Sequence, residues 1–394
     1  MTSSPRPHVW FTGFLVLGIL LGSIGPMLVA WQYHLDADPR EIGLHFLALN
    51  AGYVAAAAFC QRLLRRRSIR SVVIAASGVA AAGLVGLTFA APPEPVGWRL
   101  VGLAVLGLAG GALATALFHC LEPTSKEGAG KLAIQASAWF SSGCLLAAVI
   151  IGGAYSTGRD VLETILLAVV PLVFLAVFVR EPVPVPLPIR PARDVRSLRM
   201  VATVLFSLLL FFQFGNEWAL AGWLPLFLIR RLGSNPVAAI FALAVYFLFL
   251  VVGRGLARAL IGVVSHRKLL LASIILAMGG YLLLAATTTF SGAYTAIVVI
   301  GLGFGPIYPL IVENLDSRFA YHPGFYNGIF SIAVTGAMCA PWLLGYLCQF
   351  FGIQYVVLVP AIGSVFVCIL ALLLMLEAHL MREETPSDHS ALLY

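Results

Sequence analysis

Charged side chains are scarce in this chain. Asp, Glu, Lys and Arg make up 10% of its 394 residues, whereas hydrophobic residues make up 60%. Soluble globular proteins carry roughly 25% charged and 45–50% apolar residues, so a water-exposed fold could not hide this much apolar surface. The composition excludes a secreted enzyme, a DNA-binding protein and a disordered scaffold, and it indicates a protein whose solvent is partly lipid.

Several chemical motifs are absent as well. The six cysteines include no CxxC pair, so we expect neither a disulfide framework nor a metal site. The sequence has no nucleotide-binding P-loop and no HExxH zinc motif, which argues against an enzyme, an ATP-driven pump and a bound cofactor. It also has no Asn-x-Ser/Thr glycosylation sequon, which fits a protein of the bacterial inner membrane.

Long apolar runs are abundant, and they predict an all-α membrane protein with twelve transmembrane helices. A helix needs about 20 apolar residues to cross a bilayer. The predicted limits are 10–32, 42–64, 71–90, 97–119, 132–154, 162–180, 200–228, 237–257, 268–286, 293–314, 324–349 and 354–377. Prolines cannot continue a helix, so the proline-rich segment 181–199 divides the spans into six and six. We predict a first bundle over 1–180, a cytoplasmic linker over 181–199 and a second bundle over 200–394.

The distribution of Lys and Arg predicts that both termini lie in the cytoplasm. Short cytoplasmic loops of membrane proteins are enriched in these residues. With the N-terminus inside, 19 of the 24 basic residues fall on the cytoplasmic side. Those that fall outside are Arg40, Arg99, Arg159, Arg230 and Arg231. Membrane topology therefore accounts for the net charge of +7, and we expect no nucleic-acid partner.

The two halves contain a weak internal repeat. At an offset of 194 residues, segment 107–122 aligns with segment 301–316, and both carry glycines four residues apart and end in an acid. Near spans three and nine the offset becomes 197 residues, where Arg70 aligns with Arg267. Parallel six-helix halves related by pseudo-two-fold symmetry are the architecture of one large transporter class.

Together these features resemble the major facilitator superfamily, over nearly the whole chain. The basic loops after spans two and eight contain residues 59–67 (FCQRLLRRR) and 253–258 (GRGLAR). Residues 336–345 (GAMCAPWLLG) are similar to the family's glycine–proline helix motif. Residues 214–225 (FGNEWALAGWLP) resemble the fucose-permease-like branch of sugar:proton symporters. The resemblance implies transport by alternating access, with a sugar and a proton as the transported species.

Glu217 is the acid placed most deeply in a predicted span. It lies 18 residues after Arg199 and 13 before Arg230, near the middle of the membrane. A carboxylate at that depth costs roughly 2.5–3.5 kcal/mol or more and normally marks an ion or substrate path. We predict that Glu217 couples transport to protons; the alternative is an acid that only holds helices together. Gln213 shares its helical face, and Asn216 is adjacent. Residues expected to break this helix are Gly215, Gly222 and Pro225.

Polar side chains at helical spacing in other spans complete a predicted substrate site. Amides, hydroxyls and flat aromatic rings suit a sugar, because they hydrogen-bond its hydroxyls and stack on its C–H faces. The alternative is hydrogen bonding between helices, worth about 0.6 kcal/mol per contact. The predicted substrate-binding residues are Asn50, Gln135, Trp139, Gln213, Asn216, Tyr246, Tyr308 and Asn327.

Three charged residues lie near the cytoplasmic ends of their predicted helices. Arg254, Arg258 and Glu313 are predicted to form a gate of ion pairs that favours one conformation. The alternative is that these are ordinary charges whose side chains reach toward the membrane surface.

The sequence thus predicts a monomeric secondary transporter with a small-molecule substrate, protons as the coupling ion and the lipid bilayer as its surroundings. The first hypothesis is a symporter of a small polar solute such as a sugar. The second is an efflux transporter for amphipathic or cationic organic compounds, which the 25 Phe residues keep open. Many amides around the site would favour the sugar, whereas an aromatic cavity with one acid would favour the cation.

Overall fold

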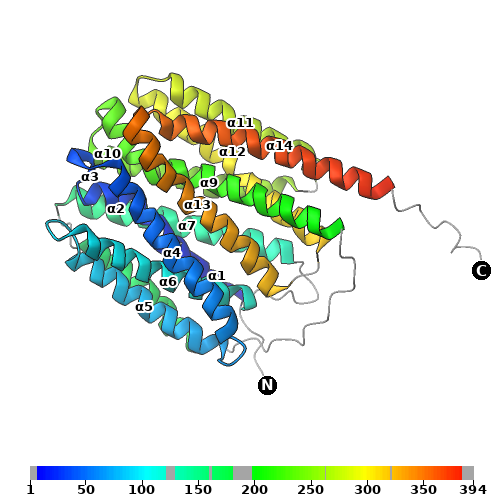
Figure 1. Ribbon diagram of the computed structural model, residues 1–394, viewed down its shortest axis with the longest axis horizontal. Coiled ribbons are helices and arrows are strands. Elements are labelled where there is room, and N and C mark those ends of the chain that lie inside the picture. The colour runs from blue at the N-terminus through cyan, green and yellow to red at the C-terminus, as the bar shows by residue number, and fades with distance from the viewer. Residues whose placement is uncertain are drawn as a thin grey trace, which may run out of the picture.

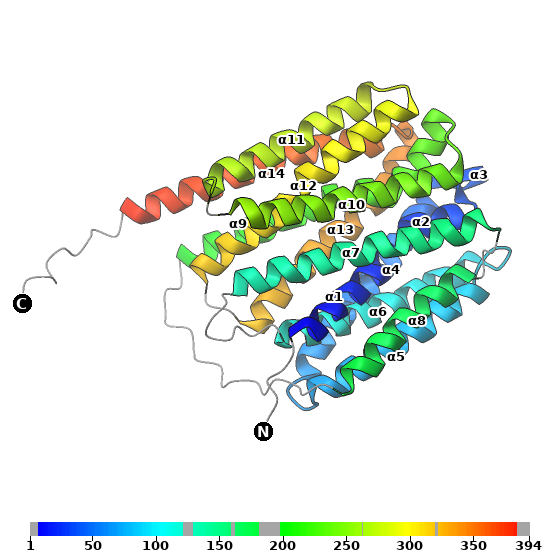
Figure 2. The same ribbon diagram turned by 180° about the vertical axis from the view of Figure 1, so that it is seen from behind.

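The computed structural model describes residues 7–120, 129–158, 162–180, 198–261, 263–319 and 322–383. Within these ranges the chain is built of α-helices, apart from an isolated bridge between Ile261 and Val264. The long helices run roughly side by side in one elongated body (Figures 1 and 2). Residues 181–197 of the predicted linker lie outside the described ranges.

The first predicted span is bent. α1 (Pro7–Gly22) and α2 (Ile24–Ala30) meet at Ser23 with a bend of 42°. The short helix α3 (Tyr33–Asp36) follows, which the sequence analysis did not predict. Sharp bends commonly occur at Gly/Ser pairs, so the continuous helix expected over 10–32 is corrected to two segments that meet at such a pair.

The other eleven spans lie within six residues of their predicted limits. Ten are long and apolar enough to cross a bilayer, while the apolar part of α8, Ile165–Phe178, is shorter. With the bent pair α1–α2, the described residues contain the twelve predicted spans. The bounds are α4 (Pro39–Leu63), α5 (Ile69–Phe89), α6 (Val96–Cys120), α7 (Ala129–Ser156), α8 (Leu162–Phe178), α9 (Leu198–Leu232), α10 (Pro236–Leu260), α11 (His266–Ala286), α12 (Phe290–Arg318), α13 (Pro323–Phe351) and α14 (Tyr355–Glu383).

Polar and proline residues place the starts of several helices. The side chain of Asp38 accepts a hydrogen bond from the backbone two residues further on, and Pro39 occupies the first turn of α4. Ser68 caps α5 in a similar way, and Asn235 before Pro236 caps α10. Each side-chain oxygen satisfies a backbone N–H that has no helical partner in the first turn. These caps set the points where the chain turns back at the membrane surface.

Span seven is continuous, contrary to the break expected at Gly215, Gly222 and Pro225. α9 runs through all three positions. Pro225 leaves the carbonyl of Ala221 without its helical donor, and a Cβ built on Gly25 of α2 would lie 2.6 Å from that carbonyl oxygen. Gly215 lies against α13, and Gly222 against α4. The glycines of α9 therefore allow close packing of neighbouring helices and do not interrupt the helix.

The two halves use the same helix pairs. α4 packs along α6 and α1 along α7 in the first half, as α10 packs along α12 and α9 along α13 in the second. A Cβ on Gly107 would collide with the carbonyl oxygen of Leu49, and one on Gly301 would lie 2.9 Å from that of Tyr246. The glycines aligned by the repeat thus occupy equivalent places in spans four and ten. A second equivalent set is Gly111 against Tyr53 and Gly305 against Leu250.

The halves meet mainly along two helix pairs, α4 with α13 and α7 with α10. Gly43, near the start of α4, lies against the backbone of Trp342. Gln61, near the end of α4, lies against Gly324 at the start of α13. α4 and α13 are therefore antiparallel and in contact over most of their lengths. Figure 1 shows them next to each other.

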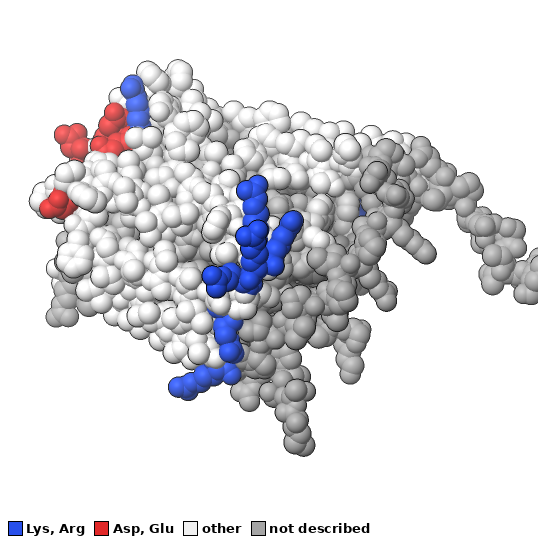
Figure 3. Space-filling model, turned by 60° about the horizontal axis from the view of Figure 1, so that its bottom comes forward, with Lys and Arg blue, Asp and Glu red and all other residues white. Residues whose placement is uncertain are grey.

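Charged side chains divide between the two ends of the molecule. On the face shown in Figure 3, acidic side chains gather at the end where α3 lies, and most basic ones lie away from it. This separation agrees with the predicted orientation, which stays a prediction. The exposed basic residues in and after the last turn of α4 are Arg62, Arg65, Arg66 and Arg67.

Candidate functional site

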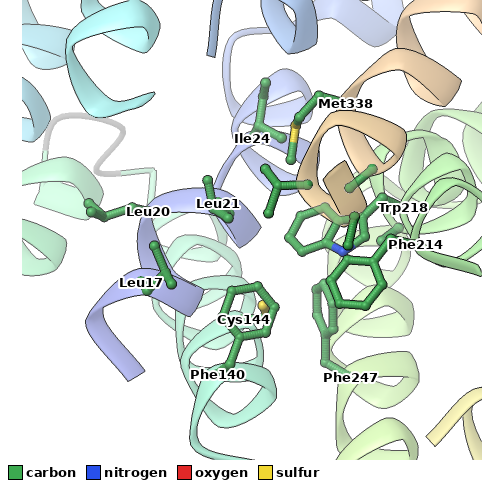
Figure 4. Packing of buried hydrophobic residues seen from close by; sticks show 14 of the residues in the cluster. Leu17, Leu20, Leu21, Ile24, Phe140, Cys144, Phe214, Trp218, Phe247 and Met338 are labelled. Atoms are coloured by element: carbon green, nitrogen blue, oxygen red, sulfur yellow. The ribbon is translucent and has the colours of Figure 1, made fainter. Parts of the chain in front are cut away.

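A small cavity lies between the two halves. Its volume is about 10 Å³, which is room for about one water molecule. Figure 4 shows apolar side chains of both halves packed together, with Phe140 and Phe214 of the cavity lining among them. The described side chains of the two halves therefore leave little free space at this point. The described residues that line the cavity are Phe14, Phe118, Ala133, Ala136, Ser137, Phe140, Phe214, Arg254, Tyr308 and Phe330.

Aromatic rings make most of the contact between the halves at this point. The ring of Phe118 on α6 lies 5.3 Å from that of Phe330 on α13. Phe140 on α7 lies 6.1 Å from Trp218 on α9 and 6.3 Å from Phe330 on α13. Such rings can separate or clamp a flat apolar surface between them. The sequence analysis did not single out these residues, because Phe is frequent in every span.

Arg254 brings a charge to the cavity wall. Its Nη2 atom lies 3.3 Å from Oε1 of Glu217, and both side chains are 1% exposed. Its Nη1 atom donates a hydrogen bond to the backbone carbonyl of Ser137 in the other half. Its guanidinium carbon lies 5.7 Å from the ring centre of Tyr308. Desolvation often cancels the attraction within a buried ion pair, so this pair is better explained by function than by stability.

The ion pair leaves polar atoms unsatisfied. Within the described part of the chain, Oε2 of Glu217 and Nε of Arg254 have no hydrogen-bond partner. The same holds for both polar atoms of the Gln213 amide, one helical turn from Glu217 and fully buried. An unsatisfied buried polar atom costs about 1–3 kcal/mol. These atoms are therefore suited to receive a proton, a water molecule or a ligand group during the transport cycle.

Asn216 and Tyr246 lie inside the second half and not at the cavity. The side-chain oxygen of Asn216 occupies the place where a Cβ on Gly363 of α14 would lie. Tyr246 donates a hydrogen bond of 3.3 Å to the backbone carbonyl of Glu217, and Tyr281 one of 3.1 Å to that of Asn216. Neither residue lines the cavity in this conformation, and the expectation that they bind substrate stays a prediction. One residue is about 100° of helix rotation, so Asn216 and Glu217 point to different neighbours.

Gln135 and Asn327 join the two halves on one side of the cavity. With its amide oxygen turned toward α10, Gln135 accepts hydrogen bonds of 3.2 and 3.3 Å from the terminal nitrogens of Arg258. Asn327 exchanges hydrogen bonds of 3.2 and 3.4 Å with the hydroxyl of Thr115 on α6. Both were predicted to bind substrate. In this conformation they are engaged with the opposite half, so they close one side of the cavity.

The remaining predicted substrate residues differ in position. Tyr308 lines the cavity, and its role there stays a prediction. Trp139 is half-buried against the core but lies outside the cavity lining. Asn50 is 7% exposed, and its Oδ1 has no partner among the described residues. It follows Gly43 by two helical turns, so it lies on the face of α4 that meets α13.

The predicted gate of Arg254, Arg258 and Glu313 does not form one cluster. Arg254 turns inward to Glu217, because its long side chain reaches the neighbouring helix inside the same half. Glu313 is 38% exposed and lies 3.4 Å from the ring of His266. Arg258 bonds Gln135, as described above. The prediction of a shared ion-pair gate is therefore corrected to three separate contacts.

The closure on the opposite side of the membrane was missed by the sequence analysis. Arg230, near the end of α9, donates hydrogen bonds of 3.1 and 3.2 Å to the backbone carbonyls of Tyr33 and Ala37. Arg99 holds the Tyr33 hydroxyl at 3.1 Å, and that hydroxyl donates to Glu41 at 2.8 Å. Burial and the bond to Glu41 raise the pKa of Tyr33, which keeps it a donor. The signal that the sequence offered was the presence of Arg99 and Arg230 on the side of the membrane expected to carry few basic residues.

Two larger grooves lie on the outer surface of the first half. One of about 580 Å³ lies between α4, α5 and α6, with Arg67 at its edge. The other, of about 650 Å³, lies between α5 and α6. Their linings come from one half only, so relative motion of the halves would neither open nor close them. The small central cavity is therefore the better candidate for a transport site.

Comparisons with known proteins agree with this architecture. The model of the Major Facilitator Superfamily matches residues 9–336. The membrane protein MosC of Rhizobium meliloti is 23% identical over 371 residues, which cover 90% of this chain and 87% of MosC. The solved structure of the fucose:proton symporter FucP of E. coli has a TM-score of 0.66 at 17% identity, covering 93% of this chain and 98% of FucP.

Two other solved transporters share the fold at similar distance. The human organic anion transporter MFSD10 has a TM-score of 0.69 at 14% identity, covering 93% of this chain and 98% of MFSD10. The nucleoside transporter NupG has a TM-score of 0.67 at 13% identity, covering 94% of this chain and all of NupG. At such low identity these similarities show a common fold and leave the substrate to be argued from the site.

Proposed function

Because the chain belongs to the Major Facilitator Superfamily, and is therefore a secondary transporter and not an enzyme, we propose that it moves a small organic solute by alternating access, coupled to protons at Glu217. The observation that carries the proposal is the buried ion pair of Glu217 and Arg254 beside the cavity between the halves. We further propose that it acts as a monomer in a bacterial inner membrane, with both termini in the cytoplasm.

Alternating access is supported by the contacts on either side of the cavity. Arg258 and Asn327 bond the opposite half on one side, and Arg230 does so on the other. A hydrogen bond between membrane helices is worth about 0.6 kcal/mol. The hydrogen bonds of each closure are therefore few and individually weak, so their loss adds little to the barrier for opening that side.

Proton coupling is supported by the isolation of Glu217. Of the acidic side chains whose exposure the structure describes, it is the one that is buried. Protonation would remove its charge and free the guanidinium of Arg254 to bind another group. Opening of one side would admit the proton from that side only, and this is the condition for coupling a proton gradient to solute movement.

The lining of the cavity bears on the class of solute. Of the five amides expected to bind a sugar, Gln135 and Asn327 are bonded to the opposite half and Asn216 lies inside the second half. Asn50 and Gln213 keep unpartnered polar atoms but lie outside the described lining, which is mainly aromatic. A sugar can stack its C–H faces on such rings, but few groups in this lining could hydrogen-bond its hydroxyls. The site therefore favours a solute with a flat apolar body and one polar group over the sugar that the resemblance implied.

The decisive transport experiment uses Glu217→Gln in proteoliposomes. A panel of sugars, aromatic acids and cationic dyes first identifies a solute that the wild type accumulates. The variant should then lose accumulation driven by a pH gradient, because glutamine cannot take up and release a proton. Counterflow exchange, which needs no net proton movement, should persist. The control is Glu377→Gln, which removes the partly exposed pair with Arg318. Gradient-driven accumulation in the Glu217 variant would reject the coupling role.

The orientation is tested separately by labelling single cysteines with an impermeant reagent. Thr288 lies exposed before α12, and Ser265 lies exposed before α11. In a background without native cysteines, Thr288→Cys should react in intact cells, and Ser265→Cys only after permeabilisation. The reverse pattern would place the termini outside.

A further inference from the structure

Arg254 is the charged residue of the cavity lining, and both halves hold it there. Glu217 on α9 accepts from one terminal nitrogen, and the carbonyl of Ser137 on α7 accepts from the other. The bond to Glu217 is a single one of 3.3 Å, and Nε has no partner among the described residues. A guanidinium can donate five hydrogen bonds and prefers two parallel ones to a carboxylate. Arg254 therefore retains the capacity to bind a carboxylate more completely than it binds Glu217.

The surroundings of the pair add no further charge. The titratable side chains that face it are Cys144 on α7, Tyr246 on α10, Tyr281 on α11 and Tyr308 on α12, none of which carries a charge near neutral pH. One carboxylate and one guanidinium therefore make the closed centre neutral. An uncompensated charge buried in such a place is strongly unfavourable, so the neutrality of the closed state restricts what it can enclose.

Each class of solute changes this balance differently. A cation would add a positive charge while Glu217 is already paired, so the closed centre would carry a net charge. A neutral solute would leave the pair intact and give Arg254 no new partner. A monovalent anion would bring the centre back to neutrality if Glu217 took up one proton as Arg254 changed partners.

We propose that the solute is a monovalent organic carboxylate, which binds Arg254 in place of Glu217 while the displaced Glu217 takes up one proton. The apolar body of the solute lies between the rings of the two halves, among them Phe140 and Phe330. Anion and proton then cross together in a 1:1 ratio, and the loaded centre is as neutral as the empty one. This inference rests on the proposed function and adds the substrate class to it.

Binding to the purified full-length protein tests the proposal with three probes that share one body. These are 3-phenylpropionate, its neutral amide and the corresponding amine, and quenching of tryptophan fluorescence is the readout. The wild type should bind the carboxylate more tightly than the amide or the amine. Glu217→Gln should bind it at least about tenfold more tightly still, because the internal competitor for Arg254 is gone. The double variant Glu217→Gln, Arg254→Gln should lose that gain.

The matched control removes another Arg–Glu pair of the same half. Arg318 and Glu377 lie 2.5 Å apart near the cytoplasmic end, and changing both to Gln should leave carboxylate binding unchanged. Failure of the Glu217→Gln variant to bind the carboxylate at 10 mM, or a preference of that variant for the amine, would overturn the proposal. A double variant that keeps the full affinity would overturn it too. If the variants do not fold, Arg254→Lys, which keeps the charge and loses the bidentate geometry, should weaken binding without abolishing it.

Transport data separate this inference from the proposed function. If a neutral or cationic solute is accumulated by a pH gradient and the accumulation depends on Glu217, the transporter function stands and the carboxylate assignment fails. If the carboxylate binds through Arg254 but its uptake does not depend on the pH gradient, the binding-site assignment stands and proton coupling is rejected.

Discussion

The two halves of the molecule share one scaffold, but within the described residues only the second carries a buried pair of opposite charges. Gly143 on α7 meets the carbonyl oxygen of Leu15 on α1 as Gly336 on α13 meets that of Phe211 on α9. This relates α1 to α9 by 196 residues, so Glu217 corresponds to Leu21. At the offset of 197 that relates α4 to α10, Arg254 corresponds to Ala57. Both counterparts are buried and apolar. Glycine contacts thus build the scaffold twice, and polar residues in one copy provide the chemistry.

The largest expected effect comes from making the second half resemble the first. Arg254→Leu alone leaves Glu217 buried without a partner and should lower the free energy of unfolding by about 3–5 kcal/mol. The double variant Glu217→Leu, Arg254→Leu should recover most of that loss while transport stays absent. Chemical denaturation in detergent measures the first result, and proteoliposome uptake the second. A double variant as unstable as the single one would mean that the pair is structural.

A smaller effect on stability should distinguish the helix packing in the two halves. Gly107→Ala forces a Cβ into the Leu49 carbonyl, whereas the equivalent contact of Gly301 with Tyr246 leaves 2.9 Å. Overpacking typically costs about 1–3 kcal/mol, so Gly107→Ala should lower the melting temperature more than Gly301→Ala. The control is Gly78→Ala on α5, where a Cβ would meet nothing within 4 Å. Equal losses at Gly107 and Gly78 would show that close packing of α4 on α6 is unimportant.

The smallest effects concern the two sides of the cavity. Arg230→Gln removes the hydrogen bonds to the carbonyls of Tyr33 and Ala37, which join the halves at the end where α3 lies. Asn327→Ala removes the hydrogen bond to Thr115 on the opposite side of the cavity. At about 0.6 kcal/mol per contact, each loss should shift the conformational equilibrium roughly threefold per bond. The readout is the alkylation rate of a cysteine at Ala133, which lines the cavity. Arg230→Gln should speed labelling from the outside, and Asn327→Ala from the inside; equal acceleration from both sides would contradict separate gates.

The spans could be predicted from sequence because the bilayer imposes a local rule. Each crossing needs about 20 apolar residues with every backbone group satisfied inside its own helix. This rule is met segment by segment, so the limits of α4 to α14 follow from composition along the chain. The glycines of 107–111 and 301–305 also marked the repeat correctly, since close helix packing requires small residues at fixed spacing. The bend at Ser23 and the continuity of α9 through Pro225 depended on neighbouring helices and were not predictable in this way.

The sequence by itself determined the membrane architecture and drew attention to Glu217, because a buried acid is costly wherever it lies. Only the tertiary structure decided which groups meet at the centre. Arg254 was expected at a cytoplasmic gate but reaches Glu217, 37 residues away in the sequence. Asn216 turns to α14 although it is adjacent to Glu217. The physical reason is that helix rotation sends successive side chains to different neighbours, and the identity of each neighbour is set by packing between segments distant in the chain.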